Sequence, residues 1–340
     1  MFKNYRFSFT KHIAQRNTGS EMMKKLTLIA PARSKYMLNQ MLDAGANEIY
    51  VGLKFPKFNQ LSFDDRFQTI AGHSAHVRSL EELQSMIEIA KKKNIKINFM
   101  ANAPYVPEAL QDDYVRFVER AVSMGIDYIT VSSIQTIKLL KKSGIGLPIV
   151  AGSSLGPTNI YMVRLLKEMG VFRITVPHCI KLEELKTWKE EGLEMITIGN
   201  FEKGSIPGSS RLWESPNHLE IGEGERTSYK IELPNGQKFR SITILDSSTD
   251  CNLCSLEALA EAGITGIKLI GREAPNPATL AAVVDLYRQW IEMGVEGIKL
   301  GEKIQIMEQE HLMWVMRWVP RFCEKNRCTY LDTPILAAYV

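Results

Sequence analysis

The sequence lacks the long apolar run that a membrane-spanning helix needs, because no stretch approaches ~18 consecutive apolar residues. It also has no G-x-G-x-x-G after its first strand-like segment, no P-loop, no H-E-x-x-H and no Ser/His/Asp spacing. These absences argue against a membrane protein, a dinucleotide-binding fold, phosphate-loop chemistry and the common hydrolase motifs. We therefore expect a cytoplasmic protein with no membrane span.

The net charge is small and cysteines are few. Forty-two Lys and Arg residues against 38 Asp and Glu residues give a net charge of +4. This small excess permits a small anionic substrate or RNA, and it supports RNA only weakly because no basic and aromatic patch accompanies it. The odd number of cysteines and the lack of a secretory signal argue against a disulfide framework. The five are Cys179, Cys251, Cys254, Cys323 and Cys328.

One unit recurs along the chain: a helix-period segment, a glycine that closes it, and a short apolar run. Eight such runs alternating with helices predict a parallel (β/α)8 barrel of the TIM type, with a doubly wound open sheet as the alternative. The glycines are Gly45, Gly125, Gly144, Gly170, Gly192, Gly263 and Gly294, and Asn94 takes the same place once. The predicted strands are Leu26–Ala30, Glu48–Leu53, Ile95–Met100, Asp127–Ser132, Pro148–Gly152, Phe172–Pro177, Glu194–Gly199 and Thr265–Ile270.

The regular pattern sets the domain boundaries. Residues 1–22, basic and free of acid before Glu21, are predicted to be a disordered or targeting tail. The barrel is expected over 23–300, with a lobe inserted at 200–250 that contains a β-hairpin around Pro234-Asn235-Gly236. Residues 301–340 have no counterpart in the repeat, and we expect them to form an extension that covers the barrel mouth.

The barrel prediction also locates the chemistry. In such barrels the reactive groups lie on the loops after the carboxyl ends of the strands. Two arginines there could hold a carboxylate or phosphate, and the neighbouring amides and hydroxyl could orient a reacting group. The predicted site residues are Arg33, Asn102, Ser153, Asn200 and Arg272.

Lys268 and His178 each leave two interpretations open. Lys268 lies inside the last predicted strand and would point into the barrel or into the helix layer, as a functional group or in an ion pair. His178, beside Cys179, could be an acid–base group or ligand, or a hydrogen-bonded structural residue.

The cysteines follow the same geometry. Cys179 ends the sixth predicted strand, and Cys251-Asn-Leu-Cys254 stands where the lobe returns to the seventh helix, at 254–262. Cys323 and Cys328 lie in the extension, which could fold back over the mouth. Four converging thiolates suit an iron–sulfur cluster, zinc is the competing metal, and plain buried cysteines are the third reading.

Several stretches together resemble the collagenase-like peptidase family, which includes oxygen-independent ubiquinone hydroxylase subunits of the UbiU and UbiV type and YegQ-type tRNA-hydroxylation proteins. The resemblance covers most of 26–292 through the order and spacing of its motifs. The stretches are LIAPAR (28–33), LDAGANEIYVGL (42–53), SLEEL (79–83), INFMAN (97–102), KEMG (167–170), LEEL (182–185), CSLEAL (254–259) and IKLIGR (267–272).

This resemblance implies an iron–sulfur enzyme or enzyme subunit for oxygen-independent hydroxylation of a small aromatic or RNA substrate, with prephenate as an oxygen donor. It implies a [4Fe–4S] cluster with zinc as the alternative, and a homologous subunit in a heterodimer, or a homodimer. Peptidase activity and a non-catalytic, cluster-carrying partner are the other readings. Only Cys254 matches a family cysteine position, so the other ligands of a cluster would stand at positions that differ from those of the family. The expected ligands are Cys179, Cys251, Cys254 and Cys328, with Cys323 as the alternative to Cys328.

Overall fold

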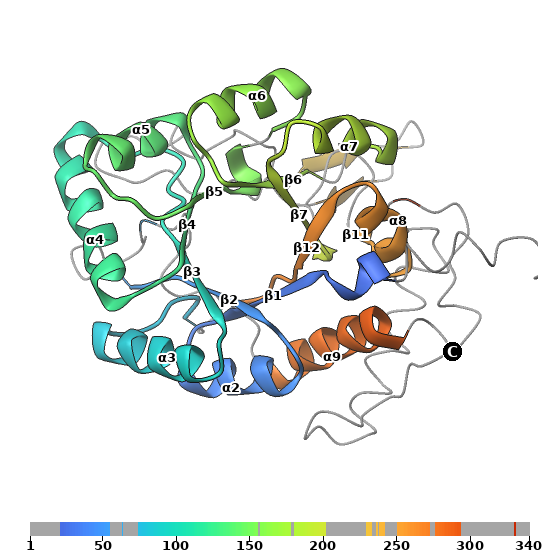
Figure 1. The fold of residues 1–340 in the computed structure, drawn as a ribbon, viewed down its shortest axis with the longest axis horizontal. Helices are drawn as coiled ribbons and strands as arrows, with labels where there is room; N and C mark the ends of the chain where they lie inside the picture. Colours follow the sequence, from blue (N-terminus) through green and yellow to red (C-terminus); the bar gives the residue numbers. More distant parts are fainter. Residues whose placement is uncertain are drawn as a thin grey trace, which may run out of the picture.

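A computed structural model describes residues 21–54, 63, 74–155, 157–177, 180–201, 229–232, 236, 238–241, 250–272, 276–293 and 330. Within these ranges the predicted (β/α)8 barrel is confirmed: parallel strands close on themselves in the order β1-β12-β7-β6-β5-β4-β3-β2, with helices around them (Figure 1). The barrel strands are β1 (Thr27–Ala32), β2 (Glu48–Val51), β3 (Lys96–Met100), β4 (Tyr128–Val131), β5 (Ile149–Ala151), β6 (Arg173–Val176), β7 (Glu194–Ile198) and β12 (Ile264–Lys268).

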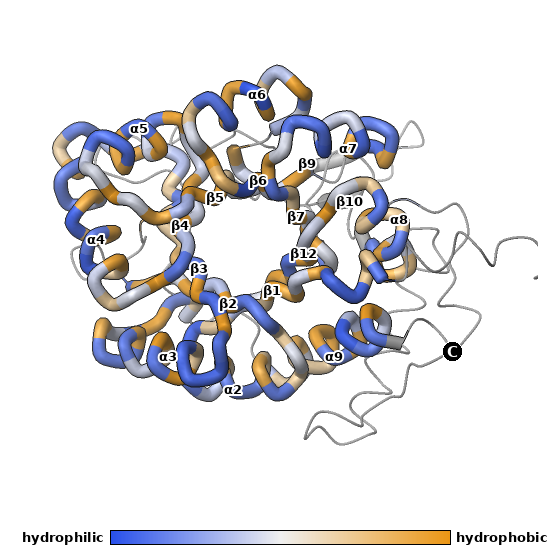
Figure 2. Tube along the Cα trace, viewed as in Figure 1, coloured by the Kyte–Doolittle hydropathy of each residue, from blue (hydrophilic) through white to orange (hydrophobic). Residues whose placement is uncertain are grey.

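The helices α2, α3, α5 and α6 begin at a Ser or Asn cap, and the surrounding helices carry apolar residues toward the strands. Ser79, for example, accepts a hydrogen bond from the backbone N–H of Glu82 at 3.2 Å and so satisfies one of the unpaired amides at the start of α3. Hydrophobic and hydrophilic residues alternate along the helices (Figure 2). The helices are α2 (Lys35–Asp43), α3 (Leu80–Lys92), α4 (Gln111–Met124), α5 (Ile134–Lys142), α6 (Ile160–Glu168), α7 (Leu182–Lys189), α8 (Leu256–Glu261) and α9 (Pro277–Met293), with short 3-10 turns at η1 (Glu108–Leu110), η2 (Ser153–Leu155) and η4 (Leu253–Ser255).

The glycines that the sequence places after helices have the left-handed backbone that this position requires. Six of the seven predicted glycines have φ between 71° and 96°, and Asn94, the predicted substitute, has φ 56°. Gly294 lies outside the described residues. The predicted repeat is therefore confirmed at these positions. The end of each helix requires a left-handed backbone, which glycine and asparagine adopt more readily than other residues.

The strands are apolar on both faces because they pack in two directions. Outward residues such as Leu28 and Ile49 join the main core beneath the helices. Inward residues form a smaller cluster inside the barrel, made of Ile29, Tyr50, Met100 and Ile196. No helix in the described ranges is long and apolar enough to cross a membrane.

The predicted hairpin in the inserted lobe is also observed. β9 (Tyr229–Glu232) pairs antiparallel with β10 (Lys238–Ser241). At the base of the lobe, β8 (Asn200–Phe201) pairs antiparallel with β11 (Asp250–Cys251). The predicted boundaries at the two ends of the chain fall mostly outside the described residues, although 21–24 are helical and Met23 is buried in the main core.

Gly263 supplies a test of the helix-closing role. Gly263→Ala should lower the free energy of unfolding by at least ~1 kcal/mol, because φ is +96° and the added Cβ would lie 2.8 Å from Lys189 Cγ. Gly146→Ala is the matched control, since no atom lies within 4 Å of its added Cβ. Urea unfolding followed by circular dichroism measures both variants, and equal loss in the two would contradict the assignment.

Candidate functional site

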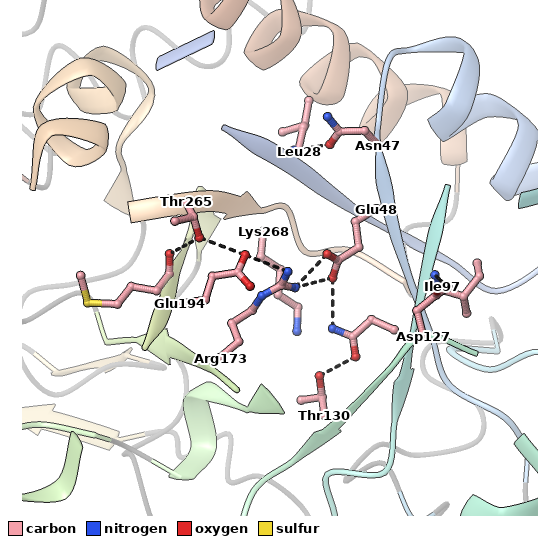
Figure 3. Close-up of polar contacts among 12 residues, drawn as sticks. Leu28, Asn47, Glu48, Ile97, Asp127, Thr130, Arg173, Glu194, Thr265 and Lys268 are labelled. Carbon is pink, nitrogen blue, oxygen red and sulfur yellow. Dashed lines mark hydrogen bonds and ion pairs between the residues drawn. The ribbon is translucent and has the colours of Figure 1, made fainter. Parts of the chain in front are cut away.

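The amino end of the barrel interior is filled by a buried ion-pair network. Glu48, Arg173 and Glu194 are the first residues of β2, β6 and β7. Arg173 Nη1 lies 2.8 Å from both carboxylate oxygens of Glu48, and Nη2 lies 3.0 Å from Glu194 Oε1 (Figure 3). β2 and β6 stand opposite each other in the strand order, so this contact spans the barrel.

Neighbouring polar groups complete the network. Asn98 Nδ2 donates to Glu48 Oε1 at 3.2 Å, and Thr130 Oγ1 donates to Asn98 Oδ1 at 2.7 Å (Figure 3). The Arg173 guanidinium also lies 4.7 Å from the centroid of the Tyr128 ring. Burial raises the pKa of the Glu48 carboxyl, and the charge of Arg173 opposes that rise. Burial by itself would lower the pKa of Arg173, but the carboxylates of Glu48 and Glu194 together raise it above its ordinary value.

This network is structural in position, because barrel sites lie at the carboxyl ends of the strands and this end is the opposite one. The sequence analysis did not find it. The signal was present: Glu48, Arg173 and Glu194 are charged residues at the starts of otherwise apolar strands, and each has the strand parity that points inward.

At the carboxyl end, the two predicted arginines come together. Arg33 follows β1 and Arg272 follows β12, which is paired with β1. Arg33 Nη1 donates to the backbone carbonyl oxygen of Arg272. The Arg272 side chain is buried, and its guanidinium carbon lies 5.8 Å from the centroid of the Tyr50 ring. This wall of the mouth is therefore cationic.

Asn200 also lies at this end, where its side-chain amide forms hydrogen bonds with the backbone of Ile270. Its Nδ2 donates to Ile270 O at 3.1 Å, and its Oδ1 accepts from Ile270 N at 2.8 Å. The side chain thus fixes the exit of β7 against the exit of β12, two residues before Arg272. Asn252 adds a second tie from the base of the lobe, donating to Ile198 O at 3.0 Å. In this structure Asn200 is a positioning residue for the segment that carries Arg272.

Asn102 and Ser153 occupy the remaining predicted positions, after β3 and β5. Asn102 is 8% exposed, and its Oδ1 has no hydrogen-bond partner among the described residues. Ser153 begins the η2 turn and is half-buried. All five predicted site residues therefore follow barrel strands at the same end, and direct contact is observed between Arg33 and Arg272.

Two of the predicted metal ligands fall in the described part of the chain. Cys251 stands opposite Asn200 in the β8–β11 pair, so its backbone lies at the carboxyl rim. Cys254 lies one turn later in η4, half-buried against the main core. Cys179, Cys323, Cys328 and His178 lie outside the described residues. Within the described ranges, no group of three or more His, Cys, Asp or Glu residues is placed to hold a metal ion.

The sequence left open whether Lys268 points into the barrel or into the helix layer. In the structure its side chain points into the barrel. It is 8% exposed, and its Nζ lies 4.4 Å from the Tyr50 ring centroid and 4.0 Å from Met100 Sδ. The strand carrying Lys268 therefore contributes a buried cation just below the arginines of the mouth.

A closed barrel of parallel strands surrounded by helices defines the (β/α)8 class, whose sites lie at the carboxyl ends of the strands. The profile of peptidase family U32 matches residues 33–209, slightly more than half of the 340 residues. The chain therefore belongs to peptidase family U32. This confirms the family-level resemblance to collagenase-like peptidases found in the sequence.

Solved structures with a similar course of the chain are only distantly related in sequence. The U32 peptidase Mk0906 is 11% identical, with a TM-score of 0.44 over 79% of this chain and 97% of its own. Thiamine phosphate pyrophosphorylase from Pyrococcus furiosus is 11% identical, with a TM-score of 0.42 over 81% of this chain and 99% of its own. No curated protein sequence matches the chain significantly.

The buried network gives a prediction about stability. Arg173→Met should lower the free energy of unfolding by ~3–5 kcal/mol, because it leaves the buried carboxylate of Glu48 without its cation. Adding Glu48→Gln to Arg173→Met should recover part of that loss. Arg164→Met is the control, since it removes an ion pair with Glu191 on the solvent-exposed surface and should change stability little. A double variant no more stable than Arg173→Met alone would contradict this account of the network.

Proposed function

We propose that the chain is an iron–sulfur enzyme or enzyme subunit that carries out oxygen-independent hydroxylation, with its substrate bound at the carboxyl end of the barrel. The observation that supports this most directly is the β8–β11 pair, which sets Cys251 beside Asn200. Asn200 in turn holds the backbone of Ile270, two residues before Arg272. A cysteine of the C-x-x-C motif is thereby joined through one side chain to the cationic wall of the mouth.

The cysteines of the chain supply the kind of donor that a cluster needs. Thiolates are the usual ligands of iron–sulfur clusters, and a C-x-x-C pair supplies two of the four that are needed. In this proposal Cys179 and Cys328 complete the set, with Cys323 in place of Cys328 as the alternative. A bound cluster would supply one-electron transfer. The chain would set the reduction potential of the cluster through the burial of its cysteine sulfurs and the hydrogen bonds to them. Cys254, one of these cysteines, is half-buried.

The substrate end of the proposal uses the residues of the mouth. Arg33 and Arg272 would hold a carboxylate, because a guanidinium offers paired N–H donors that match a carboxylate in geometry. Asn102 would orient the reacting group through its buried amide oxygen. A small anionic oxygen donor such as prephenate suits these contacts. The acceptor in this proposal is a small aromatic compound or an RNA base.

Peptidase activity and a non-catalytic partner role are the two alternatives to this proposal. Peptidase activity needs a nucleophile with a positioned base, and the one candidate pair, His178 and Cys179, lies outside the described residues. A non-catalytic, cluster-carrying partner would pair with a homologous subunit in a heterodimer and leave catalysis to it. Each makes a distinct experimental prediction, so each serves as an outcome of the test below.

Anaerobic purification should yield a brown protein with about four irons and about four acid-labile sulfides per chain. Cys251→Ala and Cys254→Ala should each lose most of both, because a cluster missing one thiolate is poorly held. Ser255→Ala, next to Cys254 but without a thiol, is the matched control and should keep the metal. Iron and sulfide analysis with absorbance spectra measures all four proteins.

The contrary outcomes are separable. Zinc without sulfide in the purified protein would show that the cysteines bind a structural zinc ion and not a cluster. A metal-free wild-type protein that cleaves peptides, and loses this activity in Cys179→Ala, would replace the proposal with hydrolysis. Full cluster content with all hydroxylation confined to a co-purified homologue would assign the chain the partner role.

A further inference from the structure

A cavity of about 430 Å³ lies on the outer wall of the barrel, where α3 meets α4. The two helices are neighbours in the ring that surrounds the strands (Figure 1). Leu53 and Lys54, which follow β2, line the cavity together with residues at the start of α3 and along α4. Small-molecule sites commonly enclose about 300–1,000 Å³, so this cavity, called here the α3–α4 cavity, is large enough for a ligand.

The lining of the α3–α4 cavity is positively charged. Arg116 and Arg120 are one turn apart on α4, so they lie on the same face of that helix. Like charges at this spacing slightly destabilise a helix, and folding by itself therefore does not favour them. Four cations against two acids give the lining a net charge of +2, from Lys54, Arg78, Arg116 and Arg120 with Glu81 and Asp113.

Both acids of the cavity already have partners. The Asp113 carboxylate lies 2.9 Å from Arg116 Nη2. The pKa of Glu81 is lowered by hydrogen bonds from the Ser79 hydroxyl and from its own backbone N–H, so its carboxylate is engaged at the start of α3.

The other three cations of the cavity have no such partner. Among the described residues, the side chains of Lys54, Arg78 and Arg120 form no hydrogen bond or ion pair. All three residues are exposed at the rim of the cavity. An anion bound between them would neutralise the excess charge, which indicates a negatively charged ligand.

The floor of the cavity is apolar. Leu53 and Phe117 are buried, and Leu80 is half-buried at the first position of α3. The Phe117 ring packs against the rings of Phe63 and Phe99, with centroids 5.4 and 5.2 Å apart, so its position is fixed by the core. An apolar floor beneath a cationic rim suits a ligand that has an apolar part and a charged end.

We propose that the α3–α4 cavity binds a phosphate monoester that carries an aromatic or other apolar group. Such a phosphate has a charge of about −1.5 to −2 at pH 7, which matches the charge of the lining better than a single carboxylate does. Arg78 and Arg120 would hold the phosphate oxygens through paired N–H donors, and Lys54 would add a third positive charge. The apolar group would lie on Leu80 and Phe117.

This site is separate from the mouth of the barrel. It lies outside the ring of strands, and none of the five predicted site residues lines it. The inference therefore goes beyond the proposed function and depends on neither a cluster nor hydroxylation. The small volume and the apolar floor favour a small ligand over RNA, whose phosphate backbone has no apolar group to bury.

Three probes separate the contribution of charge from that of apolar area: 1-naphthyl phosphate, 1-naphthoate and inorganic phosphate. Each is titrated calorimetrically into the full chain in phosphate-free buffer. The wild type should bind naphthyl phosphate at least ~10-fold more tightly than either of the others. Naphthoate carries less charge, and inorganic phosphate lacks the apolar ring.

Variants of the rim and of the floor should have different effects. Arg120→Met should weaken binding of naphthyl phosphate at least ~10-fold, because a charged hydrogen bond is lost. Arg120→Lys keeps the charge and should retain part of the affinity. Leu80→Ala should weaken naphthyl phosphate and leave inorganic phosphate unchanged, because it removes only apolar area. Arg164→Met, which removes an exposed arginine on α6, is the matched control and should leave all affinities unchanged.

Circular dichroism and thermal melts show whether each variant is folded, and Arg78→Met repeats the test on α3 if Arg120→Met is not. Equal affinity of the wild type for naphthyl phosphate and naphthoate, no binding of naphthyl phosphate, or full affinity in the folded Arg120→Met variant would overturn the proposal. A single-stranded RNA oligonucleotide that binds more tightly than naphthyl phosphate, and loses affinity in Arg120→Met, would overturn it in favour of a nucleic-acid surface.

Discussion

The contact between Arg173 and Glu48 is the constraint on which the arrangement of the barrel depends. It joins β6 to β2 across the full width of the closed sheet, and Glu194 extends it to β7. A buried ion pair of this kind contributes little net stability over an apolar filling, because desolvation of the charges offsets their attraction. Its effect is on specificity: an inward carboxylate at one end of β2 and an inward guanidinium at one end of β6 disfavour any register in which the two do not meet.

That constraint divides the barrel interior into two ends with different chemistry. At the amino end the charges satisfy one another, and the hydrogen bonds run on through Asn98 to Thr130 (Figure 3). At the carboxyl end Lys268 and Arg272 share the Tyr50 ring, while Asn102 and Thr175 keep buried oxygens without a partner in the described part of the chain. The paired charges at the amino end support the fold, and the buried oxygens of Asn102 and Thr175 at the other end are available to accept a hydrogen bond from a ligand.

The sequence predicted the barrel well because its signals are local. Glycines with positive φ close the helices, and apolar runs mark strands buried on both faces, so each barrel strand was located to within about two residues. The five predicted site residues follow from the same topology. The ion-pair network and the inward direction of Lys268 were not predicted, because they depend on the parity of single residues and on contacts between strands far apart in the chain. Pairing of Glu48 with Arg173 links positions 125 residues apart.

The antiparallel pair of β8 and β11 has a consequence for how this fold tolerates change. It brings residues 201 and 250 side by side, so the chain leaves the barrel and re-enters it at one point. The entropic cost of closing such an excursion grows only with the logarithm of its length. Evolution can thus lengthen, shorten or exchange the segment between them without moving the strands on either side. Relatives can therefore differ in this segment while keeping the same barrel.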